Sequence, residues 1–589
     1  MTDLLYLLPP SSVVLAAAAL ALVLDRRKAH AVGFAAVAAV VPWSLALRAR
    51  PGSYVATSFA SFDVVLLEVD VYSVLMAVLF GGFGAAAVVY SASSNASNTQ
   101  LSAALAYVGV SLGAVYSGDW LSLVFHWELM AVFSTVLVWL YGGKAVRAGY
   151  RYALFHGVGG SLLMLAVTLA YVDAGGFAFD VLEFEGIAAL LAALGIGVNV
   201  GFVGLHTWLP DTYPRPHVAA SVFLCAYTTK AGVYVAYRAF PDGDVALAYM
   251  GGAMAVYGVV FALLQKDMRR LLSYHIQAQV GYMIAAIGLG GSLAVAGGFA
   301  HVFNHVLYKG LLFMAAGVVV YRTGENSLKK VSGLRHTMPV TALAFTVAAL
   351  SIAAFPGFNG FVSKGMIVDA AHESSRYVVG GEDVLWWLLI LGGVGTYMSF
   401  AKFEVEAFLG SEPSHDEGDA NRGQTAALLG LAGACVALGL APGLLFDLLP
   451  GGWESHPFSR GHLVEGLGIA AVGVAGYVAA RPLLARVEPP REMGYVYEVV
   501  VFEASRALAR ATTAVYAAVD GVAVDLATRA VEVAREPGDA VEGVLPSSVR
   551  ERYVERRAST PGDTGLRLGI GEAVVVTSLL LALAVILLT

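Results

Sequence analysis

Long apolar runs recur along the whole chain, and short polar segments separate them. A run of about 18 to 25 apolar residues forms a helix long enough to cross the roughly 30 Å hydrocarbon layer of a bilayer. The pattern therefore predicts an all-α, polytopic membrane protein with about sixteen transmembrane helices. The predicted spans are 4–24, 31–47, 71–90, 101–117, 120–141, 151–172, 186–206, 217–239, 245–264, 271–290, 295–320, 339–370 (interrupted), 384–408, 424–446, 464–484 and 573–588.

Composition agrees with this prediction and excludes several classes of function. Of the 589 residues, 58% are apolar and 13% are charged, a mixture that the surface of a soluble protein does not tolerate. The two cysteines, Cys225 and Cys435, lie far apart, which excludes a zinc or iron–sulfur site built on paired thiolates. The sequence has no recognisable glycine-rich phosphate loop. We expect no metal, no cofactor and no nucleic-acid partner.

Charges in the loops predict the orientation of the chain. Basic residues follow the odd-numbered spans, as in Arg26-Arg27-Lys28, and acidic residues follow the even-numbered spans, as in Asp173 and Asp180. Basic loops stay in the cytoplasm, which places both termini outside the cell membrane. The loop after the thirteenth span is acidic, but acidic residues contribute little to this rule. The first run ends in charged residues and not at a small-residue cleavage site, so we expect a span and not a signal peptide.

The segment Tyr495–Glu536 is less apolar than the spans. It is rich in Ala and Val, carries charges along its length and stops at Pro537-Gly538, which predicts one long helix. We expect this helix to lie along the cytoplasmic side of the membrane, in contact with a neighbouring subunit, before a last span. A linker helix without a partner is the alternative.

Ionisable residues inside the predicted spans are the main candidates for function. A charged side chain at the centre of a span costs about 2.5–3.5 kcal/mol on insertion scales, so its presence calls for a functional explanation. Glu128, Lys230 and Lys364 each lie within a span. Burial and neighbouring charges together bring the proton affinity of such groups toward neutral pH, where they can exchange protons.

A second set of ionisable residues shares one helix face. His301, His305 and Lys309 recur at every fourth position, and residues with that spacing line the same face of a helix. Three polar groups over two turns need water or polar partners around them. Histidine suits a relay because its pKa already lies near neutrality. We therefore interpret this face as part of a path for protons or cations.

Three other residues have a structural explanation beside a functional one. A hydrogen bond to a carbonyl explains His126 or His275 as readily as ion transport does. Lys402, in the thirteenth span, fits a side chain that reaches back to the cytoplasmic edge better than it fits a path residue.

Prolines and glycines interrupt two of the predicted spans. Pro210 lies near the end of the seventh span, and Pro356-Gly357 and Gly360 lie within the twelfth. Irregular backbone inside a membrane is tolerated only where protein or water satisfies it. Two interrupted helices five spans apart predict two related halves, the fourth to eighth and the ninth to thirteenth spans.

Six short motifs follow one another in this part of the chain. They are His126-Trp127-Glu128, Leu205-His-Thr-Trp-Leu-Pro-Asp211, Thr229-Lys-Ala-Gly-Val-Tyr234, Gln277-Ala-Gln-Val-Gly-Tyr282, His301-Val-Phe-Asn-His-Val-Leu-Tyr-Lys-Gly-Leu-Leu-Phe313 and Gly357-Phe-Asn-Gly-Phe-Val-Ser-Lys364. In this order, over about residues 65–410, the chain resembles the antiporter-like subunits shared by multisubunit Na+/H+ antiporters (their D-type subunit), the complex I family and membrane-bound hydrogenases.

The resemblance implies inverted five-helix repeats with broken seventh and twelfth helices. Matched by motif, Glu128 is the fifth-helix carboxylate, Lys230 the eighth-helix lysine and Lys364 the broken-helix lysine of the second half. The resemblance also implies that His301, His305 and Lys309 form the relay connecting the two halves.

One position departs from the family pattern. The family has a lysine about seven residues before the motif that contains His206, and Asn199 stands there instead. An amide does not bind a proton near neutral pH. Either Lys230 takes over as the partner of Glu128, or the first half transports poorly. We keep His206, Asn199 and Lys402 as secondary site residues.

The expected organisation follows from the spans and the motifs. We predict N-terminal helices over 1–100, a first repeat over 101–240, a second repeat over 241–410, additional spans over 411–490, a lateral helix and linker over 491–570 and a final span over 571–589.

The function that these observations favour is ion translocation within a complex. We expect a proton- or cation-translocating subunit of a multisubunit Na+/H+ antiporter, with other membrane subunits, the lipid bilayer, and protons with or without Na+ as its partners. The alternative is a proton-pumping subunit of a complex I-like NADH:quinone oxidoreductase or a membrane-bound hydrogenase, without redox centres of its own. A non-transporting scaffold subunit, which Asn199 favours, is the third interpretation.

Overall fold

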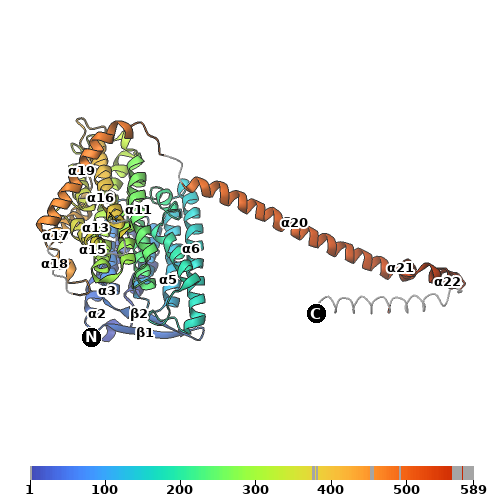
Figure 1. Ribbon diagram of the computed structural model, residues 1–589. Coiled ribbons are helices and arrows are strands. Elements are labelled where there is room, and N and C mark those ends of the chain that lie inside the picture. The colour runs from blue at the N-terminus through green and yellow to red at the C-terminus, as the bar shows by residue number, and fades with distance from the viewer. Residues whose placement is uncertain are drawn as a thin grey trace. The chain divides into compact units, whose positions relative to one another are not determined.

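The computed structural model describes residues 3–374, 378–379, 382–451, 457–489 and 493–559, together with Val574. The chain divides into two units, Met1–Pro490 and Arg491–Thr589. The first unit is a bundle whose helices run side by side, with a β-hairpin at the end where the chain begins (Figure 1).

The helices of the first unit follow the predicted spans closely. They are η1 (Asp3–Tyr6), α1 (Pro10–Ala21), α2 (Arg26–Leu47), α3 (Val71–Ser93), α4 (Asn98–Tyr116), α5 (Trp120–Trp139), α6 (Lys144–Ala174), α7 (Gly186–Val200), α8 (Trp208–Thr212), α9 (Val218–Leu224), α10 (Thr228–Ala239), α11 (Val245–Leu264), α12 (Met268–Leu289), α13 (Gly291–Thr323), η2 (Leu328–Lys330), α14 (Pro339–Ile352), α15 (Asn359–Glu373), α16 (Val384–Phe403) with a π-helical turn (Glu404–Phe408), α17 (Arg422–Leu440), α18 (Gly443–Phe446) and α19 (Arg460–Leu484).

Fifteen of the sixteen predicted spans coincide with helices or helix pairs, and the span predicted over 573–588 lies outside the described residues apart from Val574. Within the described ranges, twelve helical segments are long and apolar enough to cross a membrane, and α1, α7 and α14 are shorter apolar helices. The polytopic all-α fold is therefore confirmed. The predicted location of the two termini outside the cell stays a prediction.

The second unit contains α20 (Met493–Arg535), α21 (Pro537–Val544) and α22 (Ser547–Ala558). The long helix predicted over Tyr495–Glu536 is confirmed as one continuous helix of 43 residues. One stretch of α20 is itself long and apolar enough to cross a membrane, so its lateral position stays a prediction.

Polar residues directly before the apolar runs explain where many helices begin. The side chain of Asp70 accepts a hydrogen bond from Ser73 N at the start of α3, and Ser97 accepts one from Gln100 N at the start of α4. In both cases the third helical residue bonds back to the cap, which completes a capping box. A cap satisfies backbone N–H groups that the first turn leaves without partners.

The sequence analysis did not predict a β-hairpin between the second and third spans. Strands β1 (Gly52–Phe59) and β2 (Phe62–Val69) pair in antiparallel register around Ala60 and Ser61, which both have positive φ. Such a turn matches the twist of the strands it joins. Gly118 N donates to the carbonyl of Val65 at 2.9 Å, so the hairpin is attached to the loop before α5. A second short hairpin joins β3 (Val378–Val379) and β4 (Glu382–Asp383).

Two helices, α12 and α13, occupy the centre of the bundle. Almost every residue of α12 is buried, which explains why this helix carries several polar residues and has no lipid-facing side. Gly251 of α11 and Gly281 of α12 bring the two helices into backbone contact, because a β-carbon on Gly281 would lie 2.6 Å from the Gly251 carbonyl oxygen. Small residues at such crossings allow tight helix packing in membranes.

Three spans are interrupted inside the bundle. The break after α7 is confirmed, but it lies at Gly201, with φ of +78°, and not at Pro210, which sits within the short helix α8. The break between α14 and α15 is confirmed at Ala353–Phe358. A third break, between α9 and α10 at Cys225–Tyr227, was not predicted, because no proline or glycine marks it.

Candidate functional site

The predicted face of α13 lies at the centre of the bundle. His301, His305 and Lys309 have no exposed surface. The rings of His301 and His305 are 6.3 Å apart between centroids, so the two imidazoles follow one another along the helix. The structure therefore brings these three predicted residues together in a buried row.

His301 connects α13 to two neighbouring helices. Its Nδ1 lies 3.0 Å from Ser363 Oγ of α15, and its Nε2 lies 3.3 Å from Gln279 Oε1 of α12. The hydroxyl of Tyr308 also lies 3.3 Å from Nε2. Ser363 directly precedes Lys364, so His301 is one hydrogen bond away from the backbone that carries this lysine.

His305 and His275 are as buried as His301 but differ from it in their hydrogen bonds. Within the described part of the chain, neither ring nitrogen of either residue has a hydrogen-bond partner. Buried polar atoms without protein partners are the places where ordered water is expected. The structural alternative fits His126, whose Nδ1 lies 2.8 Å from the carbonyl oxygen of Ser122, whereas His275 makes no such bond among the described residues.

The lysines of the site bind backbone carbonyls. Lys230 Nζ donates to the Cys225 carbonyl at 2.6 Å and to Thr229 Oγ1 at 3.0 Å, and Lys309 Nζ donates to the Leu272 carbonyl at 3.3 Å. Among the described residues, neither lysine lies within ion-pair distance of a carboxylate. Hydrogen bonds to carbonyls therefore hold these ammonium groups in place.

Lys364 is held in the same way. Its Nζ donates to the carbonyl of Ile352 at 3.0 Å, and it lies 4.5 Å from the centre of the Tyr282 ring. Ile352 ends α14 and Cys225 follows the end of α9, so Lys364 and Lys230 each reach back across a helix break to a C-terminal carbonyl. The C-terminal end of a helix favours a positive charge. Burial disfavours the same charge, so the carbonyl and the buried surroundings act in opposite directions on the protonation of each lysine.

Glu128 lies apart from the lysines, between α5 and α6. Its Oε1 is buried and has no hydrogen-bond partner among the described residues. The carboxylate rests on Gly160 of α6, where a β-carbon would overlap Oε1. Lys230 is therefore not the hydrogen-bonded partner of Glu128 in this structure, although the sequence analysis considered that pairing.

Asn199 has a partner that the sequence analysis missed. Its Oδ1 lies 2.6 Å from Nδ1 of His156, a fully buried residue of α6. His156 precedes Gly160 by four residues, which places it one turn from the Glu128 carboxylate on the same face. The rule that selected Glu128 and Lys230, an ionisable residue within a span, also applies to His156 and would have found it.

A row of hydroxyl groups leads from His156 toward Lys230. The ring of Tyr152 lies 4.1 Å from the ring of His156, and its hydroxyl lies 3.2 Å from Thr228 Oγ1. Thr228 belongs to α10 and directly precedes Thr229, the side-chain acceptor of Lys230. The Tyr152 and Thr228 hydroxyls lie within hydrogen-bond distance of each other, but no hydrogen bond among the described residues joins either hydroxyl to His156 or to Lys230.

The secondary residues His206 and Lys402 make hydrogen bonds of their own. His206 Nδ1 accepts a hydrogen bond from Gly204 N at 3.3 Å, within the loop after α7. Lys402 is buried, and its Nζ donates to the carbonyls of Leu263 at 2.9 Å and Gln265 at 2.6 Å, at the end of α11. Lys402 therefore caps a helix end, which favours the structural explanation for this residue.

The fold is that of a polytopic membrane protein with a row of buried ionisable residues at its centre. A family model described as NADH:quinone oxidoreductase/Mrp antiporter, transmembrane region, matches residues 117–384. The chain is similar to this family over that region.

Three relatives illustrate the range of the family. The chain is 30% identical over 328 residues to the D-type subunit of the Na+/H+ antiporter of Alkalihalophilus pseudofirmus, covering 52% of this chain and 65% of that relative. It is 29% identical over 364 residues to the N-type subunit of the NADH-quinone oxidoreductase of Desulforudis audaxviator, covering 56% and 72%. A chain in the structure of the membrane-bound sulfane sulfur reductase, an archaeal respiratory membrane complex, superposes with a TM-score of 0.69 at 25% identity, covering 82% of this chain and 85% of that one. The chain thus spans just under two thirds of the antiporter relative.

Proposed function

We propose that this chain is an ion-translocating subunit of a multisubunit Na+/H+ antiporter complex. The buried row along α13 supports the proposal most, because His301, His305 and Lys309 have no exposed surface and lie between two lysines at helix breaks. Ionisable groups at membrane depth mark proton and ion pathways. The similarity to the D-type antiporter relative supports this choice of complex.

In the proposed mechanism, each group passes a proton to the next. Neutral imidazole accepts a proton on one ring nitrogen and releases one from the other, so His301 and His305 suit transfer between Lys230 and Lys364. Lys230, Lys309 and Lys364 all lie close enough to His305 to interact with it electrostatically. A proton arriving at one lysine therefore changes the proton occupancy of the others.

In the first half, we assign the role of the missing lysine to His156. Asn199 holds Nδ1 of this histidine, and Nε2 is buried without a partner among the described residues. His156 then exchanges protons with Glu128, one turn away, and Tyr152 and Thr228 lead on to Lys230. This assignment gives Glu128 a titratable neighbour in place of the missing lysine and weakens the case for a scaffold subunit.

The direct test is ion flux through the otherwise complete complex with and without this chain. The proposal expects Na+- or proton-coupled flux only when the chain is present. Equal flux in its absence, with the remaining subunits still assembled, would overturn the proposal.

A proton-pumping role in a redox complex is the second candidate. The similarity to a quinone oxidoreductase subunit and to a chain of the sulfane sulfur reductase favours it. Purification in mild detergent separates the two candidates. Copurifying iron–sulfur or flavin subunits favour the redox complex, and small membrane subunits without redox centres favour the antiporter.

A further inference from the structure

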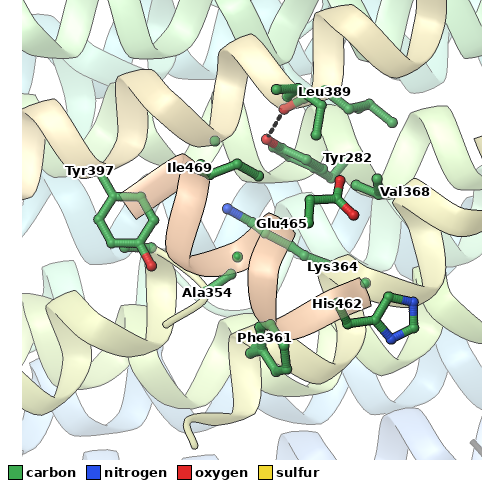
Figure 2. Close-up of a pocket in the computed structure, with 15 residues that line it drawn as sticks. Tyr282, Ala354, Phe361, Lys364, Val368, Leu389, Tyr397, His462, Glu465 and Ile469 are labelled. Atoms are coloured by element: carbon green, nitrogen blue, oxygen red, sulfur yellow. Dashed lines mark hydrogen bonds between the residues drawn. The ribbon is translucent and has the colours of Figure 1, made fainter. Parts of the chain in front are cut away.

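A cavity lies beside Lys364. Among the residues of the proposed path, Lys364 is the one that lines it. It has a volume of about 60 Å³, and its walls come from α12, α15, α16 and α19 (Figure 2). One water molecule needs at least about 10–15 Å³ measured in this way, so the cavity has room for several. Lys364, Tyr282 and Glu465 are among its lining residues.

Glu465 is the carboxylate of this cavity. It lies on α19, and its Oε1 is buried without a hydrogen-bond partner among the described residues. Figure 2 shows Glu465 and Lys364 on the walls of the same cavity, with Tyr282 bonded to the Leu389 carbonyl above them. A buried carboxylate oxygen that faces a cavity and lacks a protein partner is a place for water or an exchanging proton.

A hydrogen bond between a histidine and a carboxylate lies one turn from Glu465. His462 Nε2 is 2.8 Å from Asp369 Oδ2 and joins the start of α19 to α15. The side chains of His462 and Asp369 are 29% and 33% exposed, whereas Lys364 is 5% exposed. Side-chain exposure therefore increases along α15 from Lys364 to Asp369. The cavity is lined by Lys364, by Val368 one turn later and by His462.

We propose that Glu465 and the His462–Asp369 pair form the outlet through which Lys364 exchanges protons with the aqueous phase. The inference rests on the proposed function, since it extends the same path. A proton leaves the Lys364 ammonium, crosses the cavity through water to the Glu465 carboxylate, and then passes to Nδ1 of a neutral His462 imidazole, whose Nε2 remains bonded to Asp369. Lys364 is left as a neutral amine that accepts the next proton from the His301 side.

Other titratable groups face the outlet. Tyr282 of α12 and Tyr397 of α16 line the cavity, and His372 of α15 interacts electrostatically with Glu465. Neither tyrosine releases a proton readily near neutral pH, because a phenol titrates near pH 10. Glu465 is therefore the group between Lys364 and the surface that is suited to carry the proton.

The alternative to a proton outlet is a purely structural role for Glu465, His462 and Asp369. Glu465 lies in the second turn of α19, and His462–Asp369 would join two helices whether or not protons pass. Glu465→Gln separates the explanations, because the amide keeps the shape of the side chain but does not bind a proton. We expect about a hundredfold loss of flux, at the lower end of the range typical of removing a proton-transfer group. Glu465→Asp should retain most of the flux.

The matched control is Asp180→Asn, which removes an exposed carboxylate from the loop between α6 and α7. It should leave flux unchanged. Normal flux in Glu465→Gln, while Glu128→Ala and Lys364→Ala abolish it, would overturn the outlet and leave the proposed function intact. Normal flux in all three variants would overturn both.

Water access to the cavity gives a second test that does not depend on flux. Val368 lines the cavity, and the natural cysteines Cys225 and Cys435 are buried. Val368→Cys should react with a small, charged, membrane-impermeant thiol reagent, because thiolates form where water reaches them. Val306→Cys, on the buried part of α13, should not react. Failure of Val368→Cys to react in the assembled complex would overturn the outlet.

Discussion

The two predicted halves of the bundle carry different groups near their broken helices. In the first half, Asn199 lies just before the break at Gly201 and is bound to His156, one turn from Glu128. In the second half, Lys364 lies just after the break between α14 and α15 and donates to the Ile352 carbonyl. One half thus holds an imidazole beside an amide, and the other holds an ammonium beside a cavity.

The difference has a physical consequence. Burial disfavours the charged form of both groups, and each half offsets this cost with different neighbours. In the first half we expect His156 to exchange protons together with Glu128, one turn away. The second half depends on the balance between burial and the Ile352 carbonyl at Lys364.

The largest expected effect comes from the second half. Lys364→Ala removes the only titratable side chain that we place directly at that break, and we expect flux to fall by about a hundredfold or more. Fluorescence quenching in everted membrane vesicles measures the loss. Lys329→Ala, which removes an exposed lysine, is the control. A rate near that of the wild type for Lys364→Ala would remove Lys364 from the path.

The next prediction tests whether ion flux depends on the position of the Glu128 carboxylate. Gly160→Ala places a methyl group where the Glu128 carboxylate now rests, and the flexible side chain must move away. We expect about a tenfold loss of flux, since small displacements of a reacting group have costs of this order. Gly157→Ala is the matched control, because nothing lies within 4 Å of the added carbon. Equal flux in the two variants would show that the position of Glu128 has no influence.

The third effect tests the assignment of His156. His156→Gln should reduce flux about tenfold, since glutamine does not bind a proton. Asn199→Lys in the same chain restores a titratable group at the family position and should recover part of the flux, with a changed pH profile. Asn199→Lys alone should also change the profile. Unchanged profiles in both chains would contradict the role of His156.

The smallest effect concerns the hydrogen bonds of His301. Ser363→Ala removes the bond to Nδ1, but Gln279 and Tyr308 still hold Nε2. A single hydrogen bond is worth about 0.5–1.5 kcal/mol, so flux should fall by about twofold to tenfold. A loss as large as that of Lys364→Ala would mean that Ser363 itself carries the proton.

The helices were predictable because lipid imposes a simple rule on the sequence. A span must be long and apolar, and this rule located fifteen of the sixteen predicted spans among the described helices, although it missed the short helix α8. The hairpin β1–β2 lies outside that rule, because it packs on the ends of helices and not in lipid. The break between α9 and α10 carries no proline or glycine, so only the packed structure reveals it.

The candidate site was predictable in its residues but not in its pairings. Glu128, Lys230, the α13 face and Lys364 follow from charge at membrane depth and from motifs. The bond between His156 and Asn199 joins residues 43 positions apart, and the cavity at Glu465 depends on how α19 packs. Such contacts arise from tertiary packing, and the period of a single helix contains no information about them.

The most direct measurement of the central claim is proton flux in proteoliposomes that contain the complete purified complex and a pH-sensitive dye. An imposed ion gradient should drive proton movement with the wild-type chain. The same gradient should drive none with a chain that carries Glu128→Ala and Lys364→Ala together. Flux at the wild-type rate from that double variant, assembled to the same level, would contradict the claim that these buried groups carry protons through the bundle.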